Sequence, residues 1–339
     1  MRATRSRSIG IGVAAVVAGA LVLGTGQAHA ETPTPTPTPS GLSTPTTSGG
    51  STPTPERVAT PTPGSTDTTT SIAEMDRTGN HQMGAGIARF AGERELTTVV
   101  PQASSAAGAR TQATAQAATA GGPPPGKIQG FDISAWQPNV NFRNAYNAGA
   151  RFAYIKATEG VSYVSPVYKE HYATARTRNI IRGGYVYAQP SQASGAATAN
   201  FFFANGGGWS ADGLTLPPLL DIEYGSAAQG VCYGKSWADM RSWIKDFSNT
   251  VHKKIGRYPL IYTTTDWWKR CTNNSSQFQD NPLFVALYPV KDFTNPGTVG
   301  NSWKNYSFWQ WASSGPLPGD QDVYRSTMTN LKKMATRRD

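Results

Sequence analysis

The chain has 339 residues, but its first third is too poor in branched and aromatic side chains to build a hydrophobic core. All nine Trp and all fourteen Tyr lie within residues 126–339, which are enough for one domain with a sizeable core. This part carries 23 of the 31 Lys and Arg and 14 of the 21 Asp and Glu, a net charge of +9. The composition excludes a second folded domain upstream and favours an anionic partner: nucleic acid, a membrane surface or an acidic cell wall.

The N-terminus has the pattern of a secretory signal peptide. Three arginines within the first seven residues precede an apolar run over Ile9–Leu23, and Ala28 and Ala30 frame a small-residue cleavage site. A membrane anchor is disfavoured because the run is short and interrupted by glycines. We therefore expect residues 1–30 to be removed, the protein to be secreted, and no membrane association after cleavage, since no later segment reaches a spanning length.

Two stretches of low complexity follow. Residues 31–71 are almost entirely Thr, Pro, Ser and Gly, a composition typical of a semi-rigid spacer with polyproline II character. Residues 72–125 are mostly Ala, Gly, Thr, Gln and Ser, with short helical patterns at 72–77 and 87–90. They are either more linker or a pro-region, and the sequence leaves both open. A Gly-Pro-Pro-Pro-Gly stretch at 122–126 marks the boundary of the folded domain, 126–339.

Strand-like and helix-like segments alternate from residue 127 onward. The predicted strands are 128–133, 152–156, 183–188, 217–223, 259–263 and 283–287, and the predicted helices between them are 140–150, 166–178, 192–204 and 236–253. After residue 289 the pattern changes to strands without obvious helices, at 307–311 and 321–324. This alternation predicts an α/β fold with a parallel sheet that closes into a barrel.

In such a barrel, polar residues at the C-terminal ends of the strands gather on one face. The candidates are Asp132, Lys156, Glu159, Tyr185, Tyr187, Asp221, Glu223, Tyr262, Gln310 and Asp320. This set is rich in carboxylates and aromatic rings, and it contains no histidine. Lys156 and Glu159 form either a functional pair or a structural ion pair.

Asp221 and Glu223 are the strongest feature of this set. Residues two apart on a strand project from the same face, so these carboxylates lie together at the end of an apolar strand. Two like charges at this spacing raise at least one pKa, which supplies a proton donor near neutral pH. The alternative to a functional pair is a strand end that reaches solvent and carries two acids without a function. Asp132 and Asp320 end or follow other strands, and several carboxylates among aromatic rings suit carbohydrate hydrolysis.

The two cysteines, Cys232 and Cys271, both lie in the folded domain. In an exported protein the expected arrangement is one structural disulfide, which closes a loop of about forty residues. The neighbouring cluster Trp267–Arg270 either stacks on sugars or caps the core beside the disulfide.

Six motifs carry a resemblance to a known family: GFDISAWQ (130–137), FAYIKATEG (152–160), GGY (183–185), LPPLLDIE (216–223), IY (261–262) and WQW (309–311). In this order and spacing they resemble glycoside hydrolase family 25, the Chalaropsis-type lysozymes or N-acetylmuramidases, over residues 128–325. The resemblance implies an irregular, TIM-barrel-like (β/α) barrel of about five β/α units followed by antiparallel strands.

The resemblance also implies roles for the site residues. Glu223 becomes the general acid, Asp132 and Asp221 the flanking carboxylates, and Asp320 the acid of the family's late motif. The aromatic residues Tyr185, Tyr262 and Trp309 are expected to line a sugar cleft, with further substrate contacts from Tyr187, Gln310, Lys156 and Glu159. Two positions depart from the family pattern. Val186 stands where His is frequent, which is expected to alter substrate contacts. Asp322 is an extra acid in place of the usual Asn of the late motif, which leaves the choice between Asp320 and Asp322 open.

The sequence thus predicts a secreted, bacteriolytic hydrolase that cleaves the β-1,4 bond between N-acetylmuramic acid and N-acetylglucosamine in peptidoglycan. It is expected to be a monomer that needs no metal or cofactor. A non-catalytic module that binds the cell wall on the same fold is the alternative, and a glucosaminidase or chitinase specificity stays open. A nucleic-acid partner is disfavoured because the Lys and Arg residues are scattered rather than arranged in a stripe.

Overall fold

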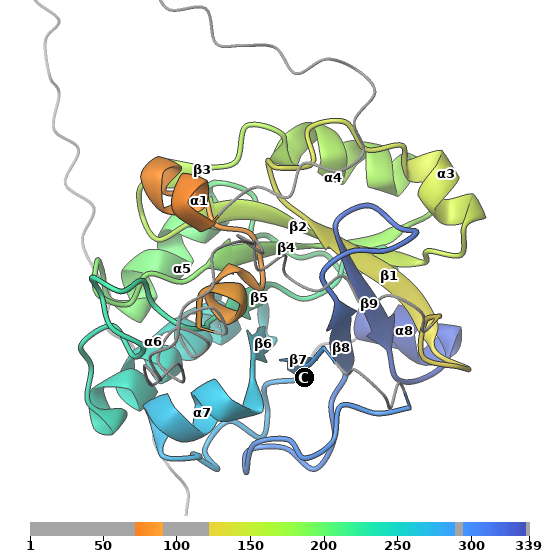
Figure 1. Ribbon diagram of the computed structural model, residues 1–339. Helices are drawn as coiled ribbons and strands as arrows, with labels where there is room; N and C mark the ends of the chain where they lie inside the picture. The colour runs from red at the N-terminus through yellow and green to blue at the C-terminus, as the bar shows by residue number, and fades with distance from the viewer. Residues whose placement is uncertain (1–71, 91–121, 289–293, 337–339) are drawn as a thin grey trace, which may run out of the picture. The chain divides into compact units, whose positions relative to one another are not determined.

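The computed structural model describes residues 72–90, 122–288 and 294–336 (Figure 1). The predicted signal peptide (1–30) and spacer (31–71) lie outside the described residues, as does much of the predicted pro-region or linker. Within the described ranges, no helix is both long enough and apolar enough to cross a membrane.

Eight strands close into a barrel, which confirms the predicted fold class. In chain order the strands are β1 (Ile128–Ile133), β2 (Phe152–Glu159), β3 (Tyr163–Val164), β4 (Ile181–Tyr187), β5 (Leu219–Asp221), β6 (Leu260–Thr263), β7 (Leu283–Ala286), β8 (Phe308–Ala312) and β9 (Asp320–Tyr324). Their spatial order is β1-β9-β8-β7-β6-β5-β4-β2, a pairing of β1 with β2 closes the ring, and β3 is an appended hairpin strand. The predicted antiparallel end is present, since β9 runs antiparallel to both β8 and β1.

Five of the strands are each followed by a helix on the outside of the barrel (Figure 1). These helices are α3 (Phe142–Asn147), α4 (Tyr168–Thr177), α5 (Gly195–Ala204), α6 (Trp237–Ile255) and α7 (Thr265–Thr272). No helix separates β7, β8 and β9 among the described residues, which agrees with the predicted change of pattern after residue 289. Two further helices, α1 (Ile72–Thr78) and α8 (Met328–Met334), stand outside the β/α units, and residues 85–90 are also helical.

The longest helix illustrates how the sequence sets these boundaries. α6 begins after Ser236, whose side chain accepts a hydrogen bond from the backbone N–H of Asp239, and it ends at Gly256, whose φ of 67° a side-chain-bearing residue adopts with strain. Between the caps, an apolar stripe that includes Met240 and Phe247 is buried against the barrel. The sequence does not predict α7, because a helix of eight residues is too short to show a clear apolar period.

Alternation along the strands creates two apolar layers. One lies between the strands and the surrounding helices. The other fills the barrel interior and consists mainly of large side chains from alternate strand positions: Phe152, Tyr154, Ile181, Tyr185, Leu219, Leu260, Tyr262, Phe284 and Phe308. Leu331 and Ala335 from α8 and its C-cap join the interior layer. They lie at the N-terminal ends of the parallel strands, where the backbone N–H of Gly213, ahead of β5, donates to the Ala335 carbonyl over 3.2 Å.

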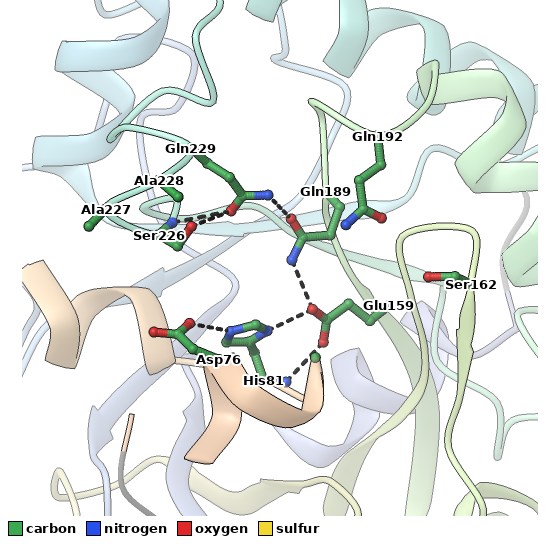
Figure 2. Close-up of a pocket in the computed structure, with 11 residues that line it drawn as sticks. Asp76, His81, Glu159, Ser162, Gln189, Gln192, Ser226, Ala227, Ala228 and Gln229 are labelled. Carbon is green, nitrogen blue, oxygen red and sulfur yellow. Dashed lines mark hydrogen bonds and ion pairs between the residues drawn. The ribbon is translucent and has the colours of Figure 1, made fainter. Parts of the chain in front are cut away.

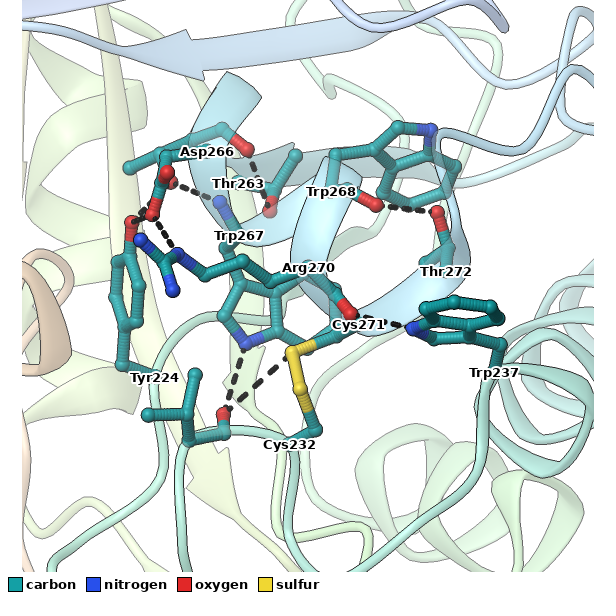
Figure 3. The surroundings of a disulfide bond; sticks show 12 residues. Tyr224, Cys232, Trp237, Thr263, Asp266, Trp267, Trp268, Arg270, Cys271 and Thr272 are labelled. Carbon is teal, nitrogen blue, oxygen red and sulfur yellow. Dashed lines mark hydrogen bonds and ion pairs between the residues drawn. A yellow bond between two sulfur atoms is a disulfide. The ribbon is translucent and has the colours of Figure 1, made fainter.

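The predicted disulfide is present between Cys232 and Cys271, with the two Cα atoms 5.3 Å apart (Figure 3). It joins the loop after β5 to α7. Trp267 and Trp268 are fully buried beside it, and the Trp267 indole donates to the backbone carbonyl of Val231 over 3.1 Å. Of the two interpretations of this cluster, the structure therefore supports a cap on the core.

Candidate active site

The carboxylates singled out by sequence lie at one end of the barrel. Asp132 and Asp221 stand near or at the C-terminal ends of β1 and β5, and Glu223 follows β5. Asp320 opens β9, and because β9 runs antiparallel to β1 it pairs directly with Asp132. All four side chains are buried. Burial of four acids at one end of a sheet disfavours their ionised forms and lowers the stability of the fold. Such a costly arrangement is typical of a functional site.

Both oxygens of Glu223 are held by backbone groups that come from far along the chain. Oε1 accepts a hydrogen bond from the N–H of Gly84 over 2.8 Å, and Oε2 accepts one from the N–H of Ile87 over 3.0 Å. Burial raises the pKa of Glu223 to about 7, although these two hydrogen bonds favour its ionised form. A carboxyl group with this pKa still holds its proton over much of the range near neutral pH.

Gln310 connects two of the acids to two tyrosines. Its Nε2 donates to Asp132 Oδ2 over 2.7 Å and to Asp320 Oδ2 over 3.0 Å. Its Oε1 accepts from the hydroxyls of Tyr262 and Tyr288, both over 2.6 Å. The amide therefore fixes the orientation of both carboxyl groups, and burial followed by the nearby Glu223 charge raises the pKa of Asp132 to about 8, although the Gln310 bond lowers it.

Asp221 differs from Asp132, Glu223 and Asp320, and resembles the buried Asp322, because neither of its carboxyl oxygens has a hydrogen-bond partner in the described part of the chain. Burial first, and then the charges of Glu223 and Asp132, raise its pKa well above the usual range. A buried acid without a partner is available to a ligand that brings its own hydrogen-bonding groups. Asp322 lies two residues further along β9 than Asp320 and pairs in register with Gly130, so Asp320 is the acid that the Gln310 amide brings to Asp132.

Lys156 and Glu159 form a buried ion pair, with Nζ 2.6 Å from Oε2. Their spacing of three would place them on opposite faces of a regular strand, but β2 has a bulge between Lys156 and Thr158 that turns both inward. Glu159 also accepts from Gln189 Nε2 over 2.8 Å and lies 2.6 Å from Nδ1 of His81. Burial opposes its ionisation, but the Lys156 charge and the His81 hydrogen bond overcome this and lower its pKa to about 2.

The predicted tyrosines lie beside these acids. Tyr185 and Tyr187 are buried on β4, and the Tyr185 hydroxyl accepts a hydrogen bond from the N–H of Met83 over 3.3 Å. The ring of His81 stacks on Tyr187 with 5.0 Å between ring centroids. Tyr262, Gln310, Lys156 and Glu159 also lie where the sequence predicted them, at the end of the barrel that carries the acids.

A pocket of about 560 Å³ opens next to Glu159 (Figure 2). In it, His81 stands between Asp76 and Glu159, and Gln189 links Glu159 to Gln229, whose Nε2 donates to Gln189 Oε1 over 2.7 Å. The remaining lining is small or polar, with Gly79, Ser162, Gln192, Ser226, Ala227 and Ala228. Such a lining suits a ligand with many hydroxyl and amide groups. No cluster of three or more His, Cys, Asp or Glu suited to a metal ion occurs among the described residues.

Two sequence-based expectations do not match the positions of their residues. Trp309 lies in the layer between strands and helices, where its indole donates to the carbonyl of Leu287 over 2.7 Å, because its neighbour Gln310 faces the interior. Val186 is buried in the same layer, between the inward-facing Tyr185 and Tyr187, so it is remote from any substrate contact. Neither side chain joins the carboxylates.

Several residues of the site carry no signal in the sequence. Tyr288 follows β7 without a motif, and Gln189 lies just past β4. The contacts that involve His81, Met83 and Gly84 connect positions 78 to 139 residues apart, so no local pattern announces them. Only the possible helix around residue 87 and the suggested pro-region pointed to this part of the chain.

Comparisons with known proteins give matches over the barrel. The family described as Glycosyl hydrolases family 25 matches residues 131–320. The N,O-diacetylmuramidase of Chalaropsis sp is 46% identical over 213 residues, which cover 62% of this chain and 99% of that protein. Lysozyme M1 of Streptomyces globisporus is 37% identical over 214 residues, 61% of this chain and 72% of that protein.

Solved structures give the same result. A family GH25 lysozyme from Aspergillus fumigatus is 44% identical with a TM-score of 0.60, covering 62% of this chain and all of that chain. A bacterial lysozyme from Streptomyces coelicolor is 37% identical with a TM-score of 0.59, covering 62% of this chain and 98% of that chain. The matched residues include the barrel and its carboxylates. The sequence identities of 37–46% are higher than those at which only the fold is shared. The chain belongs to glycosyl hydrolases family 25.

Proposed function

We propose that this protein is a peptidoglycan hydrolase, a lysozyme that cleaves the β-1,4 bond between N-acetylmuramic acid and N-acetylglucosamine. The observation that carries the proposal is the buried Glu223, whose raised pKa of about 7 leaves a proton available at neutral pH. The muramidase and lysozyme names of the relatives support the choice of bond.

In the mechanism that we propose, Glu223 donates its proton to the glycosidic oxygen as the bond from that oxygen to the anomeric carbon breaks. Positive charge then develops at the anomeric carbon, and a nearby carboxyl group stabilises it. A water molecule finally bonds to the anomeric carbon through its oxygen, and its proton returns to Glu223. Asp221 suits a contact with the reacting sugar because it has no hydrogen-bond partner among the described residues. Asp132 and Asp320, oriented by Gln310, add negative potential when they ionise.

Tyrosine rings and the polar pocket would bind the sugar chain. Tyr185, Tyr187 and Tyr262 offer flat apolar faces beside the acids, and sugar rings stack on such faces. The barrel side of the pocket near Glu159, with Gln189, Gln192 and Ser226, would accept the hydroxyl and acetamido groups of a neighbouring sugar. The net charge of +9 of residues 126–339 would help retain the protein on an anionic cell wall, so binding should weaken as salt is added.

Export is part of the same proposal. The predicted cleavage after Ala30 would release a protein that starts at Glu31, and the disulfide between Cys232 and Cys271 suits an oxidising compartment. Sequencing the N-terminus of protein recovered from the culture medium tests this. A mature chain that starts at residue 31 supports export, whereas retention of residues 1–30 contradicts it.

The test of the activity uses residues 122–339, since the fungal relatives correspond to this part along their whole length and the barrel therefore suffices as a domain. The protein is incubated with purified peptidoglycan, and new reducing ends are reduced with borohydride and identified. We expect muramitol from the wild type and none from Glu223→Gln. Glucosaminitol instead would support a glucosaminidase. No new reducing ends from a folded protein that still binds the wall would overturn the proposal in favour of a wall-binding module.

A further inference from the structure

The segment over residues 72–90 lies against the residues that the proposed function needs. Its backbone N–H groups at Gly84 and Ile87 hold both oxygens of Glu223. The Glu223 carboxylate thereby caps the N-terminus of the helical turn at 85–90. In most helices a Ser or Asp side chain of the same segment accepts these hydrogen bonds. A glycosidic oxygen cannot reach the carboxyl group of Glu223 while the backbone of Gly84 and Ile87 lies against both of its oxygens.

The side chains of the same segment fill the space around the acid. Met83 is fully buried in the interior layer, in the cluster that contains Tyr185 and Tyr262. His81 stacks on Tyr187, with its two ring nitrogens 2.6 Å from Glu159 and 2.9 Å from Asp76. The segment thus covers the tyrosine faces on which a sugar would stack.

Further hydrogen bonds attach the segment at its centre. The Trp136 indole donates to the Asn80 carbonyl over 2.7 Å, and Lys156 donates to Asn80 Oδ1 over 3.2 Å and to the carbonyl of His81. The backbone N–H of His81 donates to Glu159 Oε2 over 2.9 Å. Polar groups of the barrel that a polysaccharide would be expected to use are therefore satisfied by the chain itself.

Two glycines permit this close fit. A Cβ at Gly86 would lie 2.5 Å from the backbone oxygen of Tyr224 and 2.9 Å from Glu223 Oε2. A Cβ at Gly84, where φ is +85°, would lie 2.6 Å from the hydroxyl of Tyr288. A Cβ at Gly208, on the exposed surface of the barrel, would by contrast meet nothing within 4 Å. The two glycines of the segment that lie against Glu223 and Tyr288 therefore leave no room for a side chain.

We propose that residues 72–90 are an intramolecular inhibitor that occupies the catalytic cleft, so that the hydrolase is active only after this segment has left. This proposal rests on the proposed function, and it gives residues 72–90 the role of an inhibitory pro-region rather than a linker. Because the segment is covalently joined to the barrel, its effective concentration is about millimolar, and even a modest affinity keeps the cleft closed. Separation from the barrel removes this advantage and dilutes the segment.

The first experiment compares one protein before and after a cut. A recognition sequence for a site-specific protease is inserted after Ala106 in the mature chain, and hydrolysis of peptidoglycan is measured with active or inactivated protease. With an intrinsic dissociation constant of about 10 μM, a millimolar effective concentration predicts an increase in rate of about 100-fold on cutting and dilution. The same treatment of a chain without the inserted site should change nothing.

The second experiment releases the segment without a cut. Gly86→Ala forces the Cβ against the Tyr224 carbonyl and Glu223, so the uncut variant should hydrolyse peptidoglycan roughly tenfold faster than the uncut wild type. Gly208→Ala is the matched control, since it adds the same methyl group in open space at an exposed position of the barrel and should leave the rate of the uncut chain unchanged. Gly86 lies outside residues 122–339, so the rate of residues 122–339 sets the upper limit for the Gly86→Ala variant.

A binding measurement gives a readout that does not depend on turnover. A synthetic peptide of residues 72–90 is titrated into residues 122–339 by calorimetry. We expect micromolar binding, weakened about tenfold for a peptide with Gly86→Ala and about tenfold for Glu223→Gln in the domain, because the amide presents a donor to one of the two N–H groups.

The outcomes separate the two proposals. If residues 122–339 hydrolyse peptidoglycan and the uncut chain does so equally fast, the inhibitor proposal is wrong and the proposed function stands. A peptide that does not bind the domain would also overturn the inhibitor proposal. If residues 122–339 do not hydrolyse peptidoglycan at all, the proposed function fails, and inhibition of that activity fails with it.

Discussion

The two ends of the barrel are built on opposite principles. At the N-terminal ends of the strands, Leu331 and Ala335 complete the interior with apolar contacts, and Arg257 donates to the carbonyl of Met334. At the C-terminal ends, four buried acids and several tyrosines meet, and the oxygens of Asp221 have no hydrogen-bond partner among the described residues. The N-terminal end completes the apolar core, whereas the C-terminal end buries acidic groups, which lowers the free energy of unfolding. In a barrel of this kind, stability and chemistry are assigned to different ends.

The largest effect that we expect separates activity from stability at the C-terminal end. Glu223→Gln in residues 122–339 should lower the rate of peptidoglycan hydrolysis about 1000-fold, because the amide cannot donate the proton of a general acid. The melting temperature should not fall, since the change removes a buried ionisable group. Turnover and thermal melting are measured on the same preparation.

Asp280→Asn is the matched control for this change, because it makes the same acid-to-amide replacement at an exposed position. It should leave both rate and melting temperature unchanged. A Glu223→Gln variant that keeps a tenth or more of the wild-type rate would remove Glu223 from the proposed role.

The next effect concerns the disulfide bond that joins the loop after β5 to α7, near the C-terminal end of the barrel. Replacement of Cys232 and Cys271 together by Ser should lower the free energy of unfolding by about 3–4 kcal/mol, because the disulfide closes a loop over a sequence separation of 39 residues. Urea unfolding measures this, and reduced wild type should match the variant. A loss below about 1 kcal/mol would mean that packing of Trp267 and Trp268, not the disulfide, holds the loop after β5.

The apolar end should respond in the opposite way to the catalytic end. Leu331→Ala removes a fully buried side chain from the interior layer and should lower the free energy of unfolding by about 3 kcal/mol. The rate at 25 °C should stay that of the wild type, because the remaining folded population still carries an intact site. Thr329→Ala, exposed on the same helix, should change neither quantity. A change in rate larger than the change in folded fraction would contradict the separation of the two ends.

The sequence predicts the barrel well because alternation is a local property. Strand β1 has the predicted bounds, Ile128–Ile133, and Asp132, Asp221 and Glu223 could be placed at one end from strand direction alone. Trp309 and Gln310 could not both face the site, since adjacent residues on a strand point to opposite sides. The pair Lys156 and Glu159 reaches the site through a bulge, which no periodicity reveals.

Long-range contacts explain what the sequence could not reveal. The hydrogen bond from Gly84 to Glu223 joins residues 139 positions apart, and Gly84 lies in a segment whose composition is that of a linker. The motif that contacts the acid, Met83 to Ile87, contains two glycines and an alanine, and such residues are typical of many loops. Only the structure shows why a glycine is needed here, because a Cβ at Gly86 would collide with Tyr224 and Glu223.

Protonation links the acid-rich end to stability. Burial raises the pKa of Glu223 to about 7 and that of Asp132 to about 8, whereas in an unfolded chain both acids have a pKa of about 4. The unfolded chain therefore loses these protons first as the pH rises. The contribution of each group to stability is fully present below about pH 4 and is lost as the pH rises through the folded pKa. Glu159 has the opposite sign, because its pKa is lowered to about 2, so its contribution is lost only in strong acid.

The smallest effect that we expect follows from this linkage and separates the two ends once more. The melting temperature of the uncut chain, in which residues 72–90 help to bury these acids, should fall by about 5 °C between pH 5 and pH 8, because the buried acids resist ionisation that the unfolded chain undergoes freely. Glu223→Gln should make this fall smaller, since the variant lacks one of the groups concerned. Leu331→Ala should lower the whole curve without changing its slope, because no titrating group is altered at its end of the barrel. A melting temperature that rises from pH 5 to pH 8 would contradict the raised pKa values, and a slope changed by Leu331→Ala would mean that the two ends are coupled.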